Sequence, residues 1–183
     1  MEIKQQGSTL IEVLVALTIL VVGLIGIFNL HLVAKRSSFE SFQQTQASLL
    51  ANDMINRIKL NTSQLSAYGG VYSSLPSYPD VDCDLADSAS PQCTPAQTLI
   101  WDRYQWQLLM QGGYERVGDN RVGGLDFPVA CIQANANGDV LIAMTWRGVN
   151  STTDSATHYS DFVQSCGTSH SRRRVYVINT FIF

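Results

Sequence analysis

The sequence predicts an α+β protein. A long N-terminal helix packs on a C-terminal antiparallel β-sheet of three to four strands, with a short extra helix and two disulfides. Three observations predict this fold class. An apolar run occupies residues 13–34, the hydrophobic period falls to two from Val129 onward, and an even number of cysteines follows the apolar run.

The apolar run is long enough to cross a membrane. It contains only Thr18, Asn29 and His31 as polar side chains, and at about 1.5 Å per residue it spans roughly the 30 Å of a bilayer core. Past Lys35 the helix continues with one apolar stripe, formed by Ala47, Leu50, Ala51, Met54 and Ile58. We therefore expect a membrane helix over 8–34, an amphipathic continuation over 35–60 and a globular domain over 61–183.

The segment 61–92 is rich in Ser, Pro, Gly and Tyr and predicts a loop region. Its alternating acids, Asp80, Asp82 and Asp84, are similar to the start of a calcium loop. Leu85 stands where such a loop needs glycine, and Pro91 where it needs glutamate. We therefore expect a solvated acidic loop and no metal site.

A short amphipathic helix is predicted from Thr94. Thr94 is its N-cap, Pro95 its first residue and Gln97 completes a capping box. Gly112-Gly113 ends it. Trp101, Tyr104 and Leu108 follow at helical spacing, and we expect this face to pack on the domain.

The C-terminal part predicts strands. Val129–Ala134 and Val140–Arg147 flank the hairpin-turn signal Asn137-Gly138, and Val175–Phe183 is a third strand. On the second strand one face carries Val140, Ile142, Met144 and Trp146. Arg172 to Arg174, just before the third strand, are interpreted as a solvated guard against aggregation.

The four cysteines are Cys83, Cys93, Cys131 and Cys166, and none forms a C-x-x-C pair. This spacing suits two disulfides in an oxidising compartment better than zinc. We favour Cys83 with Cys93 and Cys131 with Cys166, because each pair closes a Ser-, Thr- or Pro-rich loop. Four reduced, buried thiols are the alternative.

The N-terminus reverses the order of a secretory signal, because six mostly polar residues ending at Gly7 precede the apolar run. Cleavage after Gly7 would keep the membrane helix over 8–34, called the stem from here on. It would also give Ser8 a free α-amine, which is cationic at neutral pH. A carboxylate inside the stem, Glu12, needs a partner. The amine of its own helix lies four residues away, a neighbouring helix can supply another, and snorkelling to the headgroups is the third possibility.

The stretch Gly7-Ser8-Thr9-Leu10-Ile11-Glu12-Val13 resembles the class III signal of type IV prepilins. The resemblance implies a leader over 1–7, cleavage after Gly7 by a prepilin peptidase, methylation of Ser8, and pairing of Glu12 with a neighbouring subunit's amine during assembly. It also implies the type IV pilin fold. Ser8 departs from the phenylalanine of most members.

Further segments resemble minor pilins of the PilV type, also called type IV pilus modification proteins. They are Leu10–Leu17, the paired cysteines, Ala143–Gly148 and Arg172–Tyr176. This implies a non-enzymatic subunit of type IV pili that helps to prime assembly at the tip, for twitching motility, adhesion or DNA uptake. The implied partners are other minor pilins, the major pilin, the inner-membrane assembly machinery and the prepilin peptidase, in a hetero-oligomeric filament.

The implied location is the inner membrane, as a single pass with the C-terminal domain in the periplasm, and then the pilus at the cell surface. Lys35 and Arg36 follow the apolar run, so the positive-inside rule alone favours the opposite orientation. The signal and the cysteines decide for the periplasm. A minor pseudopilin of a type II secretion system and a membrane-tethered adhesin or binding module are the alternative functions.

Composition and motifs disfavour other classes. A net charge of −3 without a basic face disfavours nucleic acid as the main partner. No nucleophile motif, metal-binding motif or phosphate-binding loop is present in the sequence, so we expect no enzyme activity and no cofactor. His31, His158 and His170 are interpreted as structural or solvated.

Overall fold

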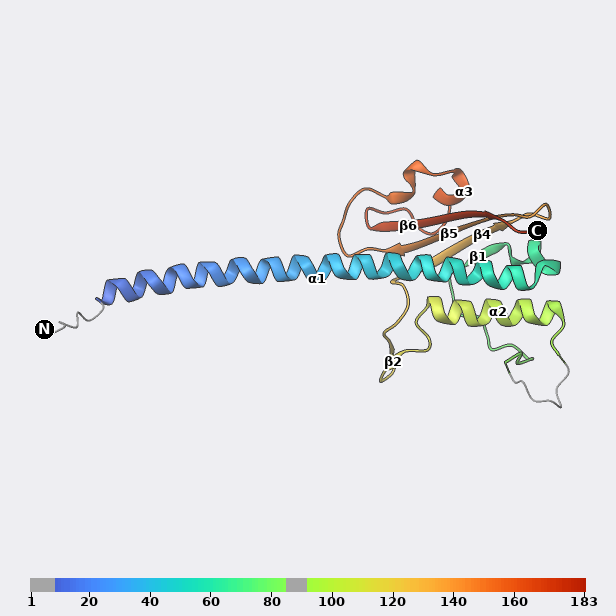
Figure 1. Ribbon diagram of the computed structural model, residues 1–183, viewed down its shortest axis with the longest axis horizontal. Helices are drawn as coiled ribbons and strands as arrows, with labels where there is room; N and C mark the ends of the chain where they lie inside the picture. The colour runs from blue at the N-terminus through green and yellow to red at the C-terminus, as the bar shows by residue number, and fades with distance from the viewer. Residues whose placement is uncertain (1–8, 85–91) are drawn as a thin grey trace, which may run out of the picture. The chain divides into compact units, whose positions relative to one another are not determined.

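The computed structural model describes residues 9–84 and 92–183. The chain divides into two units, of which the first ends at Phe39 and the second is Glu40–Phe183. Helix α1 (Leu10–Leu60) supplies the described helix of the first unit and continues into the second, which holds the other described elements (Figure 1).

Within the second unit, α1 lies between a β-sheet and helix α2 (Pro95–Met110) (Figure 1). The predicted apolar stripe is confirmed, because Ala47, Leu50, Ala51, Met54 and Ile58 are all buried. Ile55 and the polar Gln43 are buried with them. Trp106 of α2 is fully buried, and its indole Nε1 donates to the carbonyl of Leu50 over 2.8 Å. Residues 40–60 of α1 are thus a core element with partners on two sides.

The sheet has four antiparallel strands in the order β1-β4-β5-β6, within the predicted three to four. Their bounds are Gly70–Tyr72, Val129–Ala134, Asp139–Arg147 and Arg173–Phe181. The predicted turn at Asn137-Gly138 joins β4 to β5, and the φ of 103° at Gly138 explains the glycine. The last strand begins and ends two residues before its predicted bounds, because Arg173 already pairs with Arg147.

Both faces of the sheet are covered. Val140, Ile142, Met144 and Trp146 of β5 share the core with α1, as predicted. The opposite face forms a smaller cluster from Cys131, Ala143, Val163 and Cys166. There helix α3 (Asp161–Gln164), preceded by the 3₁₀ helix η2 (Ser155–His158), is tied to β4 by the Cys131–Cys166 disulfide. The second disulfide joins Cys83 to Cys93. Both pairings are those that the sequence favours.

The prediction of a structureless loop over 61–92 was wrong in its first part. The 3₁₀ helix η1 (Thr62–Tyr68) and edge strand β1 lie there, with Tyr68 and Tyr72 buried. Three residues of strand are too few to show a period of two, and the Tyr68 hydroxyl is anchored instead by a 2.6 Å hydrogen bond to Asp102. These contacts are long-range and leave no local pattern.

Helix α2 begins as predicted, with the full capping box between Thr94 and Gln97. The predicted packing face was only partly right. Leu99, Trp106 and Met110 face the main core, whereas Trp101 and Tyr104 pack on Tyr78 with ring centroids 5.8 and 5.2 Å away. Beyond α2, the strands β2 (Arg116–Val117) and β3 (Asn120–Arg121) form a separate hairpin.

Candidate functional site

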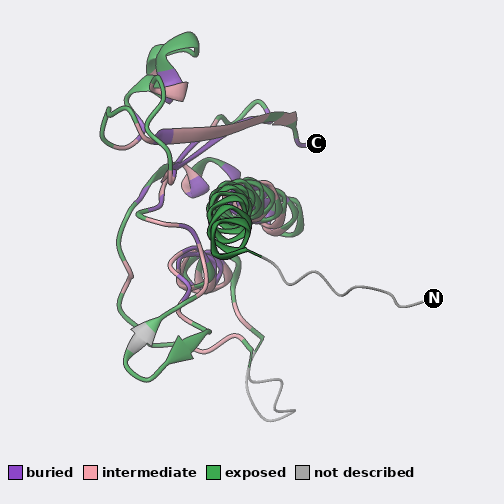
Figure 2. Cartoon of the chain, turned by 90° about the vertical axis from the view of Figure 1, so that its left-hand side faces the viewer, coloured by how far each residue is buried: buried purple, intermediate pink, exposed green. Residues whose placement is uncertain are grey.

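The first unit exposes a continuous apolar surface. Large aliphatic and aromatic side chains from Leu10 to Val33 are exposed, and this part of α1 is green in Figure 2. Among the described residues, α1 is the one helix long and apolar enough to cross a membrane. A monomeric protein in water rarely leaves a large contiguous apolar patch uncovered. The stem is therefore suited to lipid or to other apolar helices.

Glu12 lies in the first turn of this helix. Its backbone amide and that of Val13 donate to the carbonyl of Thr9 over 3.0 and 3.3 Å. The side chain is exposed, and no described residue forms an ion pair or hydrogen bond with its carboxylate. The positive end of a helix favours an acid in this turn. The carboxylate is thus accessible to a cation supplied by another molecule.

Gly7 and Ser8, the predicted cleavage and methylation residues, lie outside the described residues, which begin at Thr9. Their roles stay predictions. Glu12 belongs to the first unit, whereas Cys83, Cys93, Cys131 and Cys166 belong to the second. The predicted site residues therefore serve separate parts of the chain: the stem carries the carboxylate, and the disulfides cross-link the domain.

A second glutamate of α1, Glu40, is held by the domain. Its Oε1 accepts hydrogen bonds from the amides of Val149 and Asn150, over 2.7 and 3.1 Å, and from Arg174 Nη2 over 3.3 Å. The approach is close because Gly148 has no side chain. A Cβ there would lie 2.8 Å from the same oxygen. Glu40 therefore fastens α1 to the loop after β5.

A buried polar network joins α1 to η1 and α2. Arg57 donates through Nη1 to Asp102, and Asn61 donates through Nδ2 to the hydroxyl of Tyr68. That hydroxyl in turn donates to Asp102. Burial, followed by the hydrogen bond to Asp102, raises the pKa of Tyr68 well above its ordinary value. The network stabilises the neutral phenol of Tyr68 and the contact between α1 and α2.

Arg173 corrects the interpretation of Arg172 to Arg174 as solvated. Its side chain is only 4% exposed and its Nε donates to Asp154 over 2.8 Å. Burial alone would raise the pKa of the Asp154 carboxyl. Hydrogen bonds from Arg173, the Ala156 amide and Ser169 outweigh burial and hold that pKa well below its ordinary range. This arginine is therefore part of the packed domain and fixes the loop before β6.

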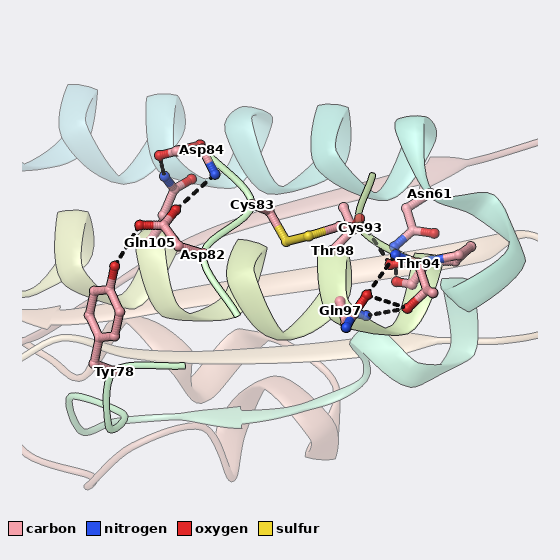
Figure 3. Close-up of a disulfide and its surroundings, with 11 residues drawn as sticks. Asn61, Tyr78, Asp82, Cys83, Asp84, Cys93, Thr94, Gln97, Thr98 and Gln105 are labelled. Carbon is pink, nitrogen blue, oxygen red and sulfur yellow. Dashed lines mark hydrogen bonds between the residues drawn. A yellow bond between two sulfur atoms is a disulfide. The ribbon is translucent and has the colours of Figure 1, made fainter. Parts of the chain in front are cut away.

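Tyr78, Asp82, Cys83 and Asp84 lie beside α2, and Cys83 is joined by a disulfide to Cys93, just before that helix (Figure 3). Asp82 accepts a hydrogen bond from the Tyr78 hydroxyl over 2.7 Å and another from the Asp84 amide over 2.9 Å. The bond to Asp82 is the main cause that raises the pKa of Tyr78 to about 12. Gln105 of α2 donates to Asp84. Across 9–84 and 92–183, no group of three or more His, Cys, Asp or Glu is placed to hold a metal ion.

Sequence reasoning did not single out the carboxylates that organise the domain, Glu40, Asp102 and Asp154. One signal was present. Asp102 stands three residues after Leu99 and four before Trp106, so it falls on a helix face that is otherwise apolar. An acid on such a face needs a buried donor. The partners of Glu40 and Asp154 are distant in sequence, so no local pattern predicts these contacts.

Residues 3–28 match a family model, the prokaryotic N-terminal methylation motif. The chain carries a prepilin-type methylation motif. The motif is typical of type IV pilins and of related prepilin-like proteins, including pseudopilins, that a prepilin peptidase processes. No curated protein and no solved structure matches the chain.

The methylation motif covers Glu12 and most of the exposed apolar stem, and it supports membrane anchoring and assembly into pilus-like filaments. It ends before the second unit. The motif therefore indicates N-terminal processing and methylation for the stem. It does not cover the domain, with its α+β fold and two disulfides.

Proposed function

We propose that this chain is a non-enzymatic minor pilin of the PilV type. A prepilin peptidase cleaves it after Gly7 and methylates Ser8. The stem then holds the chain in the inner membrane, with the disulfide-bonded domain in the periplasm, until the subunit enters a type IV pilus and helps to prime assembly at the tip. Its partners are other minor pilins, the major pilin and the inner-membrane assembly machinery.

One observation carries the proposal. Glu12 sits within the methylation motif on an exposed apolar helix and has no partner among the described residues. An unpaired carboxylate in lipid costs several kcal/mol by most estimates. A neighbouring subunit's cleaved N-terminus brings a cationic amine at the matching depth. Filament assembly then relieves a cost that the single subunit bears, and the apolar stems cover one another.

The test compares wild type with Glu12→Ala and Glu12→Gln in cells that make the pilus. Mass spectrometry of the mature chain should find an N-terminus at Ser8 in all three, because Glu12 is not needed for insertion or cleavage, and in wild type Ser8 should carry the methyl group. Both variants should lose at least about tenfold in incorporation into sheared pili, since a charge-assisted pair is worth roughly 1.5–3 kcal/mol.

Glu115→Gln is the matched control, because it removes the same charge from an exposed position of the domain. It should leave incorporation unchanged. A chain that retains Met1, or one that has lost its apolar stem, would contradict the proposal. Normal incorporation of both Glu12 variants would contradict the role of the carboxylate.

A minor pseudopilin of a type II secretion system is the second candidate, because the methylation motif is typical of both classes. Co-purification separates them. A minor pilin should be recovered with sheared pili and lost from the cell surface when the major pilin is deleted. A pseudopilin should instead be needed for protein export, with pili unchanged in its absence.

A further inference from the structure

A cavity of about 490 Å³ lies in the second unit where β4 begins and β5 ends. Its lining includes Phe127 and Pro128, before β4, and Trp146 and Arg147, at the end of β5. The loop before β6 adds Thr168 and His170, and Arg173 opens that strand. Its lining residues all belong to the second unit and are not among those that carry the proposed function.

The lining is rich in hydrogen-bond donors. Arg173 uses Nε for Asp154 and Nη1 for the carbonyls of Gln164 and Cys166. Its Nη2 has no acceptor among the described residues, although the residue is only 4% exposed. This nitrogen is not one of the fully buried side-chain atoms that lack a partner in the described chain, so it keeps some contact with solvent. The cavity, which Arg173 lines, is where an acceptor can reach it.

Two neighbouring groups add donors. Arg147 donates hydrogen bonds from Nε and Nη2 to Asp126, and its Nη1 has no acceptor in the described chain. His170 accepts the Arg172 amide at Nδ1, so the proton of its neutral ring is on Nε2. The indole nitrogen of Trp146 is not one of these donors, because it is buried in the core that the sheet shares with α1. A ligand rich in acceptors fits such a lining.

The counter-charges lie outside the cavity. Asp126 and Asp154 pair with the two arginines, yet neither carboxylate is part of the lining, which contains no acidic side chain. Each arginine is therefore paired with an acid in the fold, and each keeps one terminal nitrogen without an acceptor in the described chain. A ligand carboxylate in the cavity therefore meets the N–H groups that Asp126 and Asp154 leave free, and no acidic side chain lines the walls.

Phe127 supplies an apolar wall in an unusual conformation. Its φ is +48°, in a region that bulky residues seldom adopt, and its side chain is 70% exposed. The guanidinium of Arg147 lies 4.0 Å from the ring centroid. Next to it, the Asp126 amide donates to Gln43, and the Asp126 carbonyl accepts the Arg147 amide. The fold thus holds an aromatic ring in solvent at the cost of backbone strain.

We propose that this cavity binds an organic carboxylate whose apolar body lies against Phe127. The carboxylate accepts from Arg147, Arg173 and the His170 ring, and the aromatic face covers the carbon chain. The carboxylate belongs to an acidic side chain of a polypeptide partner or to a free small acid, and the two sources are distinguished by the probes used in the test.

The test uses the full chain in detergent micelles with ¹⁵N-labelled tryptophan. The chain has three tryptophans, so the spectrum contains three indole signals. Acetylglutamate amide should shift the Trp146 signal and leave that of the fully buried Trp106 in place. Acetylglutamine amide, the neutral isostere, should shift neither. Equal shifts with both probes, or no shift with either, would overturn the proposal.

Further probes identify the source and the chemistry. Acetate and glutarate represent free acids, and saturation with them at lower concentration than with acetylglutamate amide assigns a small-acid ligand. The reverse order assigns a polypeptide side chain. Inorganic phosphate measures general anion binding. If phosphate binds as tightly as the best carboxylate, the site is a general anion site and the proposal is wrong.

Two variants test the walls. Phe127→Gly should keep the fold, because glycine tolerates a positive φ, and should weaken binding about two- to tenfold. Phe183→Gly removes an exposed ring elsewhere and is its control. Arg147→Gln should weaken binding about tenfold or more, whereas Arg121→Gln, an exposed arginine of β3, should not. Unchanged binding in Phe127→Gly with unchanged folding would contradict the proposed apolar contact.

Discussion

The two parts of helix α1 have the same secondary structure and opposite surroundings. Leu24, in the first unit, is 56% exposed, whereas Leu50, in the second, is 6% exposed. Burying such a side chain contributes roughly 1.5–3 kcal/mol. The domain gains this energy when it folds. The exposed side chains of the stem gain this burial energy only when they contact lipid or other helices. One helix thus both stabilises the domain and provides a surface for assembly.

The two glutamates of the helix show the same contrast. Glu40 accepts three hydrogen bonds from the domain, whereas Glu12 has no partner among the described residues. A carboxylate satisfied within the chain fixes the fold. One that is left accessible in an apolar segment marks a place where another molecule completes the structure.

The largest effect should come from deleting a core aromatic ring. Trp106→Ala removes a fully buried side chain and its hydrogen bond to Leu50, so it should lower the free energy of unfolding by about 3–5 kcal/mol. The stem counterpart, Phe28→Ala, removes a ring that is 62% exposed. It should change the free energy of unfolding by less than about 0.5 kcal/mol. Denaturant titration of the full chain in micelles, followed by the fluorescence of the tryptophans that each variant retains, measures both.

Equal destabilisation by the two substitutions would contradict the division of α1 into a core half and a surface half. Membrane insertion should show the reverse order of sensitivity. Phe28→Ala removes apolar area from the segment that enters lipid, whereas Trp106→Ala leaves that segment intact.

The sequence predicted the features that repeat locally. The apolar stripe of α1, the capping box of Thr94, the Asn137-Gly138 turn and the alternation in β5 are all confirmed. Each is set by neighbours within a few residues. The prepilin-type signal belongs to the same class, because it is a short contiguous motif, and the family model matches the same residues.

Long-range pairing was not predictable in this way. Strand β1 has three residues and pairs with β4, and the tyrosines around it contact α2, Tyr68 at Asp102 and Tyr72 at Trp106. Arg173 appeared solvated because two other arginines flank it, yet its partner Asp154 comes from a separate loop. The donor-rich cavity likewise joins segments that are distant in sequence. Such contacts depend on the tertiary fold and leave no periodic signal.

An intermediate effect is expected from breaking the ion pair between Asp154 and Arg173 in the domain. The pKa of Asp154 lies below its ordinary value in the folded chain, so the folded state favours the charged carboxylate. Its stabilisation is complete above the ordinary pKa of about 4 and is lost as the pH falls through the folded pKa. Asp154→Asn should cost about 1–3 kcal/mol at neutral pH, and the difference from wild type should shrink below about pH 4.

Asp126→Asn is the control for this pH dependence. The Asp126–Arg147 pair is much more exposed, with side-chain exposures of 35% and 38%, so its loss should cost no more than about 1 kcal/mol. Urea titrations from pH 2.5 to 7 measure both variants. A constant penalty for Asp154→Asn over this range would show that the ion pair does not act through the charge of the carboxylate.

The smallest effect tests the glycines of the two parts. A Cβ at Gly23 meets no atom within 4 Å, whereas one at Gly148 would lie 2.8 Å from Glu40 Oε1. Gly23→Ala should therefore stabilise the stem helix by about 0.5–1 kcal/mol and leave unfolding of the domain unchanged. Gly148→Ala should disturb the Glu40 contacts and lower domain stability. Hydrogen exchange of stem and domain amides separates the two outcomes. Slower exchange at the domain amides in Gly23→Ala would show that stem order feeds into the core, which would contradict the independence of the two parts.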